Sequence, residues 1–242
     1  MRAIRGIIDR RILINFRVDP RALQEILPPP FQPKLVAGFG IAGICLIRLK
    51  RVRPGFLPAR VGAGSENAAH RIAVTWSNGD ARHNGVFIPR RDTNSRLNTL
   101  LGGRLFPGVH HHATFEVEED ARSLNVSMVS DDGQATLAVQ ASLTDALPTE
   151  SLFKSVSEAS RFFEEGSVGY SPGRTPGRYE GLELRAFQWS VMPLAVDRVA
   201  SSYFGAAGPL ANASPQFDCA LLMRGIDHEW HGKQSLYCDW PA

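Results

Sequence analysis

The chain has 242 residues, 43% of them apolar and 21% charged, which is typical of a globular protein rather than a disordered one. The formal charge is +3, and arginine supplies 23 of the 27 basic residues. The arginines are spread from Arg2 to Arg224 without a dense basic block interleaved with aromatic residues, which argues against nucleic-acid binding.

The first half of the chain predicts strands interrupted by two short helices. Asp19 is a good helix cap and Pro20 fits a first helical turn, while the three prolines at 28–30 end that helix. Asn78 and Gly79 indicate a hairpin turn, because both residue types tolerate positive φ. In chain order, we expect one or two strands in 4–18, a helix in 19–27, strands at 33–37 and 40–52, a loop at 54–64, strands at 67–76 and 85–90, and a helix at 95–101.

The second half predicts a meander, one longer helix and three closing strands. These elements are strands at 109–117, 123–129 and 135–143, a helix at 155–164, a rigid loop at 171–177, and strands at 179–189, 191–200 and 216–224. Asp227, His228 and Glu229 then predict a solvated polar turn. Many short strands joined by tight turns favour an antiparallel sheet that curls or closes, because closing removes exposed edges. Without a repeat or linker, residues 1–242 are expected to form a single domain.

The cysteines and the N-terminal residues predict a cytoplasmic protein. The three cysteines, Cys45, Cys219 and Cys238, are widely spaced and form no CxxC pair, which favours a reducing compartment. Arg10 and Arg11 interrupt any signal-peptide core, and the apolar run at 35–47 is too short to cross a membrane. We therefore expect no membrane partner.

The predicted strand at 66–76 presents two different faces. One face carries Glu66, Ala68, His70, Ile72, Val74 and Trp76, and we expect it to be mostly core. The other carries Asn67, Ala69, Arg71, Ala73 and Thr75, which are small or polar, as in the wall of a cavity. Glu66 is a candidate proton carrier; the alternative is an ion pair with a neighbouring arginine.

Pro89 interrupts the next strand just before two adjacent arginines. A proline inside a strand implies an edge or a bulge, and bulges re-aim side chains. If the register survives Pro89, Val86, Ile88 and Arg90 share one face, and Phe87 and Arg91 share the other. We expect one guanidinium, preferably that of Arg90, to point inward and clamp a carboxylate. The alternative is that both are solvated, with Asp92 as a surface partner.

Three consecutive histidines, His110, His111 and His112, open the meander. On a strand, His110 and His112 face one way and His111 the other. A pair at i and i+2 could bind a metal if His70, His83 or Glu66 supplied a further ligand. The preferred interpretation is a polar pocket wall that includes His112.

Four segments carry a resemblance to a known family. They are Glu66-Asn67, residues 85–91, residues 106–113 and residues 180–185. With them, residues 12–204 resemble the acetoacetate decarboxylase-like superfamily, and within it the YqjF-like family, a domain of unknown function. The resemblance implies an α+β fold, in which a curved, largely antiparallel sheet closes into a cone or barrel around a small-molecule cavity.

The same resemblance shapes the functional expectation. The decarboxylases carry Phe-Pro-Lys-Lys where this chain has Pro89, Arg90 and Arg91, and one of those lysines forms a Schiff base. Arginine stays protonated in proteins and cannot supply the free amine. The four lysines, Lys34, Lys50, Lys154 and Lys233, are expected to lie away from the site.

The expected ligand is therefore a small anionic molecule, either a carboxylate or a keto acid. Arg71, Arg90, Arg91 and Asn67 would bind it, and Glu66 or His112 would move protons in a lyase- or hydrolase-like reaction without a cofactor. Three alternatives remain open: a non-catalytic sequestering or sensing protein, a metal-dependent enzyme that uses His110 and His112, and a protein with the fold alone. The chain could form a homo-oligomer in each case.

Overall fold

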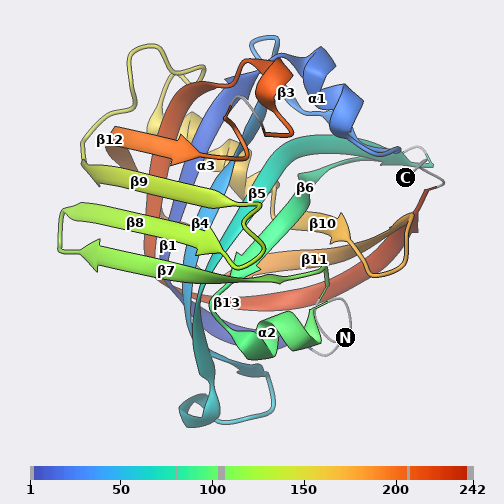
Figure 1. Ribbon diagram of the computed structural model, residues 1–242, viewed down its shortest axis with the longest axis vertical. Helices are drawn as coiled ribbons and strands as arrows, with labels where there is room; N and C mark the ends of the chain where they lie inside the picture. Colours follow the sequence, from blue (N-terminus) through green and yellow to red (C-terminus); the bar gives the residue numbers. More distant parts are fainter. Residues whose placement is uncertain (1–2, 80, 103–106, 206–207, 239–242) are drawn as a thin grey trace.

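The computed structural model describes residues 3–79, 81–102, 107–205 and 208–238. It contains one thirteen-stranded sheet that curves round on itself, with α1 and α2 at opposite ends of the view in Figure 1. Most strand pairs are antiparallel; the β10–β6 and β6–β7 pairs are parallel. The predicted fold class, a largely antiparallel sheet with a few short helices, is therefore confirmed.

The strands and helices have the following bounds. The strands are β1 Ile4–Val18, β2 Gln32–Pro33, β3 Leu35–Val36, β4 Phe39–Pro54, β5 Ala63–Asn78, β6 Ala81–Thr93, β7 His111–Glu119, β8 Ser123–Ser130, β9 Thr136–Leu143, β10 Val168–Pro172, β11 Arg178–Ala186, β12 Met192–Ser201 and β13 Gln216–Tyr237. The helices are α1 Pro20–Ile26, α2 Arg96–Leu101 and α3 Val156–Glu165, with 3-10 turns at Ala59–Val61 and Ala211–Ala213. None of the helices described is long and apolar enough to cross a membrane.

The strand pairings close two circuits that share β13, β1, β4, β5 and β6. The larger circuit is completed by β7, β8, β9 and β12, and the smaller one by β10 and β11. Closing both circuits pairs strand edges that would otherwise be exposed. The shared strands therefore have one face toward each circuit.

A separate apolar core fills each face of the shared strands. The larger core draws buried residues from every strand of the larger circuit, among them Ile14, Ile44 and Ile72. The second core lies on the opposite face and includes Leu13, Cys45 and Ala73. Helix α3 covers this second core with Ala159 and Phe163.

The helices begin where the sequence provides caps. The Asp19 carboxylate accepts a hydrogen bond from the Arg21 amide at 2.8 Å, and Pro20 occupies the first turn of α1. The Ser155 hydroxyl accepts from the Glu158 amide at 3.1 Å at the start of α3. Gly166 follows the last residue of α3.

Two predictions about local structure are wrong. The rigid loop expected at 171–177 begins inside β10, because Ser171 pairs with Glu180 of β11. The polar turn expected after residue 224 is instead a continuation of β13 to Tyr237. Its charged residues are compatible with a strand because they alternate with buried ones: His228 is buried, whereas Glu229 forms an ion pair with Arg5 at 2.7 Å.

Candidate binding site: an arginine-lined cavity

A bulge at Pro89 decides which way the two adjacent arginines point. His70 of β5 pairs with Arg90, but Ile72 pairs with Phe87, so Ile88 and Pro89 together lie opposite Arg71. The bulge that Pro89 predicts is confirmed, so the intact register on which the predicted sharing of faces depended is not present. The extra residue reverses the alternation, so that Arg90 lies on the face of the larger core with Phe87, and Arg91 lies on the opposite face.

Arg90 points inward, as expected, but protein carboxylates already occupy its guanidinium. It donates to Asp92 at 2.8 Å, to Asp132 at 2.9 Å and to the Ser130 hydroxyl at 3.0 Å. Arg90 is 8% exposed and Asp92 is fully buried. Two carboxylates offset this one positive charge, which leaves Arg90 little capacity for a ligand carboxylate.

On the opposite face of the shared strands, three arginines surround a patch of small residues. Arg91 of β6, Ala69 of β5, Cys45 of β4 and Leu13 of β1 lie side by side across the sheet. In the neighbouring row across the sheet, Arg71 of β5 lies beside Gly43 of β4, and Gly43 lies beside Asn15 of β1. Gly43 is required there, because a Cβ would lie 2.2 Å from the carbonyl oxygen of Ile14. The third arginine, Arg11 of β1, lies two positions along from Leu13.

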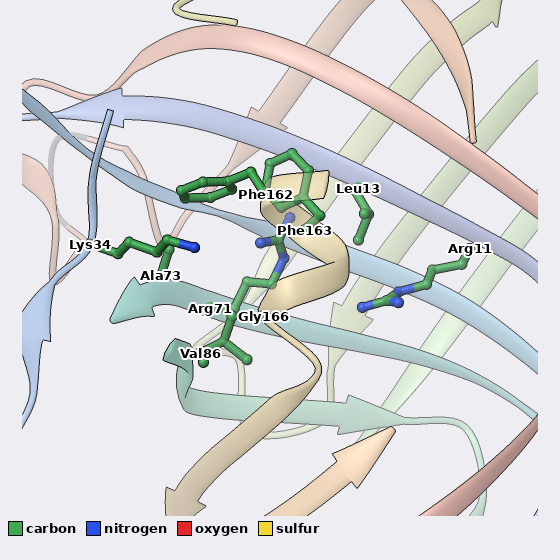
Figure 2. A pocket seen from close by; sticks show the side chains of 10 residues that line it. Arg11, Leu13, Lys34, Arg71, Ala73, Val86, Phe162, Phe163 and Gly166 are labelled. Atoms are coloured by element: carbon green, nitrogen blue, oxygen red, sulfur yellow. The ribbon is translucent and has the colours of Figure 1, made fainter. Parts of the chain in front are cut away.

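A small cavity lies between this face and α3. Its volume is about 20 Å³, and its lining residues are Arg11, Leu13, Lys34, Arg71, Ala73, Gly85, Val86, Phe162, Phe163 and Gly166. Figure 2 shows the Arg71 guanidinium next to the Phe163 side chain of α3, with Lys34 on one side of it and Arg11 on the other. A volume of this size holds about one water molecule.

Arg71 is the central group of the cavity, and its charge has no acidic partner in the described part of the chain. It is 4% exposed, its Nη2 donates to the Asn15 side-chain oxygen at 2.5 Å, and its buried Nε has no hydrogen-bond partner. Its guanidinium carbon lies 4.9 Å from the centre of the Phe163 ring. Burial lowers the pKa of Arg71 to about 10, because a guanidinium loses its hydration there without gaining a carboxylate.

The other two arginines also lack carboxylate partners. Arg11 donates to the sulfur of Cys45 at 3.3 Å, and Arg91 donates to the Ser171 hydroxyl at 2.9 Å. Burial lowers the pKa of Arg91 to about 10 as well. Within the described ranges, no salt bridge includes Arg11, Arg71 or Arg91. The three guanidinium groups together, here called the arginine cluster, place uncompensated positive charge on one face of the sheet.

Glu66 and Asn67 lie on opposite faces of β5 and both have partners within the protein. The Glu66 carboxylate accepts a hydrogen bond from the fully buried Arg10 at 2.6 Å. This contact is an ion pair with an arginine, the alternative to a role for Glu66 as a proton carrier. Burial, stronger here than the attraction of Arg10 and Arg48, raises the pKa of Glu66. The Asn67 amide donates to the Ile47 carbonyl at 3.2 Å, and its oxygen accepts from Thr93 at 2.7 Å.

The three histidines point to three different partners. The Nδ1 atom of His110 lies 3.1 Å from the Gly108 carbonyl, that of His111 lies 3.1 Å from Asp132, and that of His112 lies 2.8 Å from Asp131. Across the described residues, no three histidine, cysteine or acidic side chains converge as metal ligands would. Burial and then the charge of Arg91 lower the pKa of His110 to about 3, so His110 is the histidine coupled to the arginine cluster. Phe106, which precedes this segment in the family resemblance, lies outside the described residues.

Sequence reasoning missed Arg11 and Lys34. Arg11 was considered only as an interruption of a signal peptide, although it precedes a run of buried β1 residues. Lys34 is expected from the sequence to lie away from the site, but it lines the cavity that contains Arg71. The Lys34 backbone amide donates to the Ala73 carbonyl at 2.9 Å, which brings Lys34 to the strand that carries Arg71.

Known structures with a similar fold cover nearly the whole chain. Acetoacetate decarboxylase from Legionella pneumophila aligns with 13% identity and a TM-score of 0.62, over 98% of this chain and 88% of its own. An acetoacetate decarboxylase-like enzyme from Sphingomonas wittichii aligns with 12% identity and a TM-score of 0.59, over 98% and 92%. The enduracididine biosynthesis enzyme MppR complexed with pyruvate aligns with 10% identity and a TM-score of 0.60, over 97% and 89%.

These likenesses establish the fold. The comparison with curated proteins gave no match. A family model described as "Uncharacterized conserved protein" matches residues 8–227. The chain therefore belongs to this family, DUF2071, and has the acetoacetate decarboxylase-like fold.

Proposed function

We propose that the protein binds a small carboxylate, keto acids included, in the cavity between α3 and the arginine cluster. The observation that carries this proposal is the state of Arg71, a buried guanidinium with no acidic partner and a free Nε. Arg11 lines the same cavity, and Arg91 adds charge from the neighbouring row. This proposal retains Arg71 and Arg91 from the sequence prediction and replaces Arg90 with Arg11.

The energetic argument rests on the cost of a buried charge. An ion removed from water without a partner costs on the order of several kcal/mol. A carboxylate would recover part of this cost, because it can accept two parallel hydrogen bonds from one guanidinium. The free Nε of Arg71 provides one of the donors.

We propose no Schiff base at Arg90 or Arg91, which occupy the positions of the decarboxylase lysines. Arg90 and Arg91 stay protonated, so neither forms an iminium with a carbonyl substrate. Glu66 and His112 remain predicted proton carriers, and neither is among the residues that line the cavity. We therefore propose binding as the primary activity. The complex of MppR with pyruvate, a protein of the same fold, supports a keto acid as one ligand to test.

Calorimetry or thermal denaturation with acetate, pyruvate and acetoacetate at constant ionic strength tests the proposal. We expect at least one of these anions to bind the wild type, and binding to be lost in Arg71→Met. Arg161→Met, which changes an exposed arginine on α3, is the matched control and should bind as the wild type does. Equal binding by Arg71→Met and wild type would refute the proposed site.

A further inference from the structure

Lys34 adds a second cationic position to the cavity, at its exposed side. It lies between β2 and β3, its side chain is 16% exposed, and it lines the same cavity as Arg11 and Arg71. Its Nζ lies 4.4 Å from the centre of the Phe162 ring. Figure 2 shows its ammonium group on the opposite side of Arg71 from Arg11.

Among the residues that the structure describes, the carboxylate paired with Lys34 comes from the end of α3. The Lys34 Nζ donates to Glu165 Oε2 at 2.9 Å, and the Glu165 side chain is 48% exposed. An ion pair this exposed is worth about 0–1 kcal/mol, so another carboxylate can replace Glu165 at little cost. In the described part of the chain, Arg71 has no such carboxylate. A protein carboxylate therefore already binds at Lys34, whereas none binds at Arg71.

We infer that the cavity accepts a small dicarboxylate, with one carboxylate at Arg71 and Arg11 and the other at Lys34 in place of Glu165. This inference rests on the proposed function and specifies its substrate class. The apolar part of the cavity lining includes Leu13, Val86 and the Phe162 ring, which suit a short methylene chain. Because the present volume is only about 20 Å³, binding requires the Lys34 and Glu165 side chains to move apart.

Calorimetry with malonate, succinate and glutarate, each paired with its monoamide, tests the second position. A monoamide keeps the length of the acid and removes one charge. We expect at least one diacid to bind the wild type about tenfold more tightly than its monoamide, a difference of about 1.4 kcal/mol. In Lys34→Met this preference should disappear while the monoamide affinity stays the same, and Lys154→Met should retain the preference.

A second variant moves the affinity in the opposite direction. Glu165→Gln removes the internal carboxylate that competes for Lys34, so the affinity for the preferred diacid should rise several-fold while that for the monoamide changes little. If every monoamide binds as tightly as its diacid, or if Lys34→Met keeps the preference, the inference is wrong. Monoamide binding that still depends on Arg71 would then leave the proposed function intact. If none of these acids binds, the inference is refuted, and the titrations with acetate, pyruvate and acetoacetate decide the proposed function separately.

Discussion

Arg90 and Arg91 are neighbours in the sequence, yet they lie in opposite electrostatic environments. Arg90 faces the larger core and is paired with Asp92 and Asp132. Arg91 and Arg71 lie on the opposite face of the shared strands, where their hydrogen-bond acceptors are the Ser171 hydroxyl of β10 and the Asn15 side-chain oxygen of β1. Both faces hold buried guanidinium groups, but among the described residues only the face of the larger core supplies carboxylates that pair with them. We therefore assign Arg90 to the stability of the fold and propose the arginine cluster as the ligand site.

The largest expected effect is on the free energy of unfolding, when an arginine on one face or the other is replaced. Arg90→Met leaves the fully buried Asp92 without its cationic partner, and breaking such a pair typically costs about 3–5 kcal/mol. Urea denaturation at neutral pH should show this loss. If Arg90→Met unfolds at the wild-type urea concentration, the structural role assigned to Arg90 is wrong.

The equivalent change on the other face should behave differently. Arg71→Met removes a buried charge that has no carboxylate partner, and the new side chain is apolar like the neighbouring Phe163. Its free energy of unfolding in the absence of ligand should equal or exceed that of the wild type, in the same urea experiment. If Arg71→Met lowers the free energy of unfolding as much as Arg90→Met does, Arg71 is also a stabilising residue and the proposed difference between the two faces is wrong.

Acidic pH should destabilise both faces, because each contains a neutral buried histidine. Burial lowers the pKa of His70 on the core face from 6.5 to about 3, and that of His228 on the other face to about 4. Below pH 6.5 the unfolded chain binds protons that the folded protein does not, so stability falls as the pH falls toward these values. Each histidine contributes up to about 1.4 kcal/mol per pH unit.

Urea denaturation from pH 7 to pH 5 measures this dependence. His70→Phe should reduce the slope of stability against pH, because its ring can retain the stacking on Tyr203 without taking up a proton. His83→Phe serves as the control, because His83 is exposed. An unchanged slope in His70→Phe would show that His70 is not a neutral buried group.

The smallest effect concerns the extent of the binding site. Arg91 is in the arginine cluster but does not line the cavity, so it should act on a ligand through its charge and not by contact. Arg91→Met should weaken carboxylate binding about two- to fivefold, less than Arg71→Met does, and high salt should reduce the difference. Calorimetry at two salt concentrations measures this, and complete loss of binding in Arg91→Met would mean that the ligand contacts Arg91 directly.

The sequence was sufficient for the features that depend on local pattern. Alternation predicted the two faces of β5, Asp19 marked a helix start, and Pro89 marked a bulge. The direction of Arg90 and Arg91 after that bulge could not be obtained from local pattern, because it depends on the register with β5. Arg11 and Lys34 reach the cavity through long-range pairing, with β13 and β4 for Arg11 and with Ala73 for Lys34. Spacing along the chain contains no information about such contacts.

A crystal structure of the protein with the tightest-binding carboxylate tests the central claim most directly. We expect a carboxylate oxygen about 3 Å from Nε of Arg71, with Asp92 and Asp132 still bound to Arg90. A carboxylate bound at Arg90 in place of these two acids, with the Arg71 side empty, would contradict it.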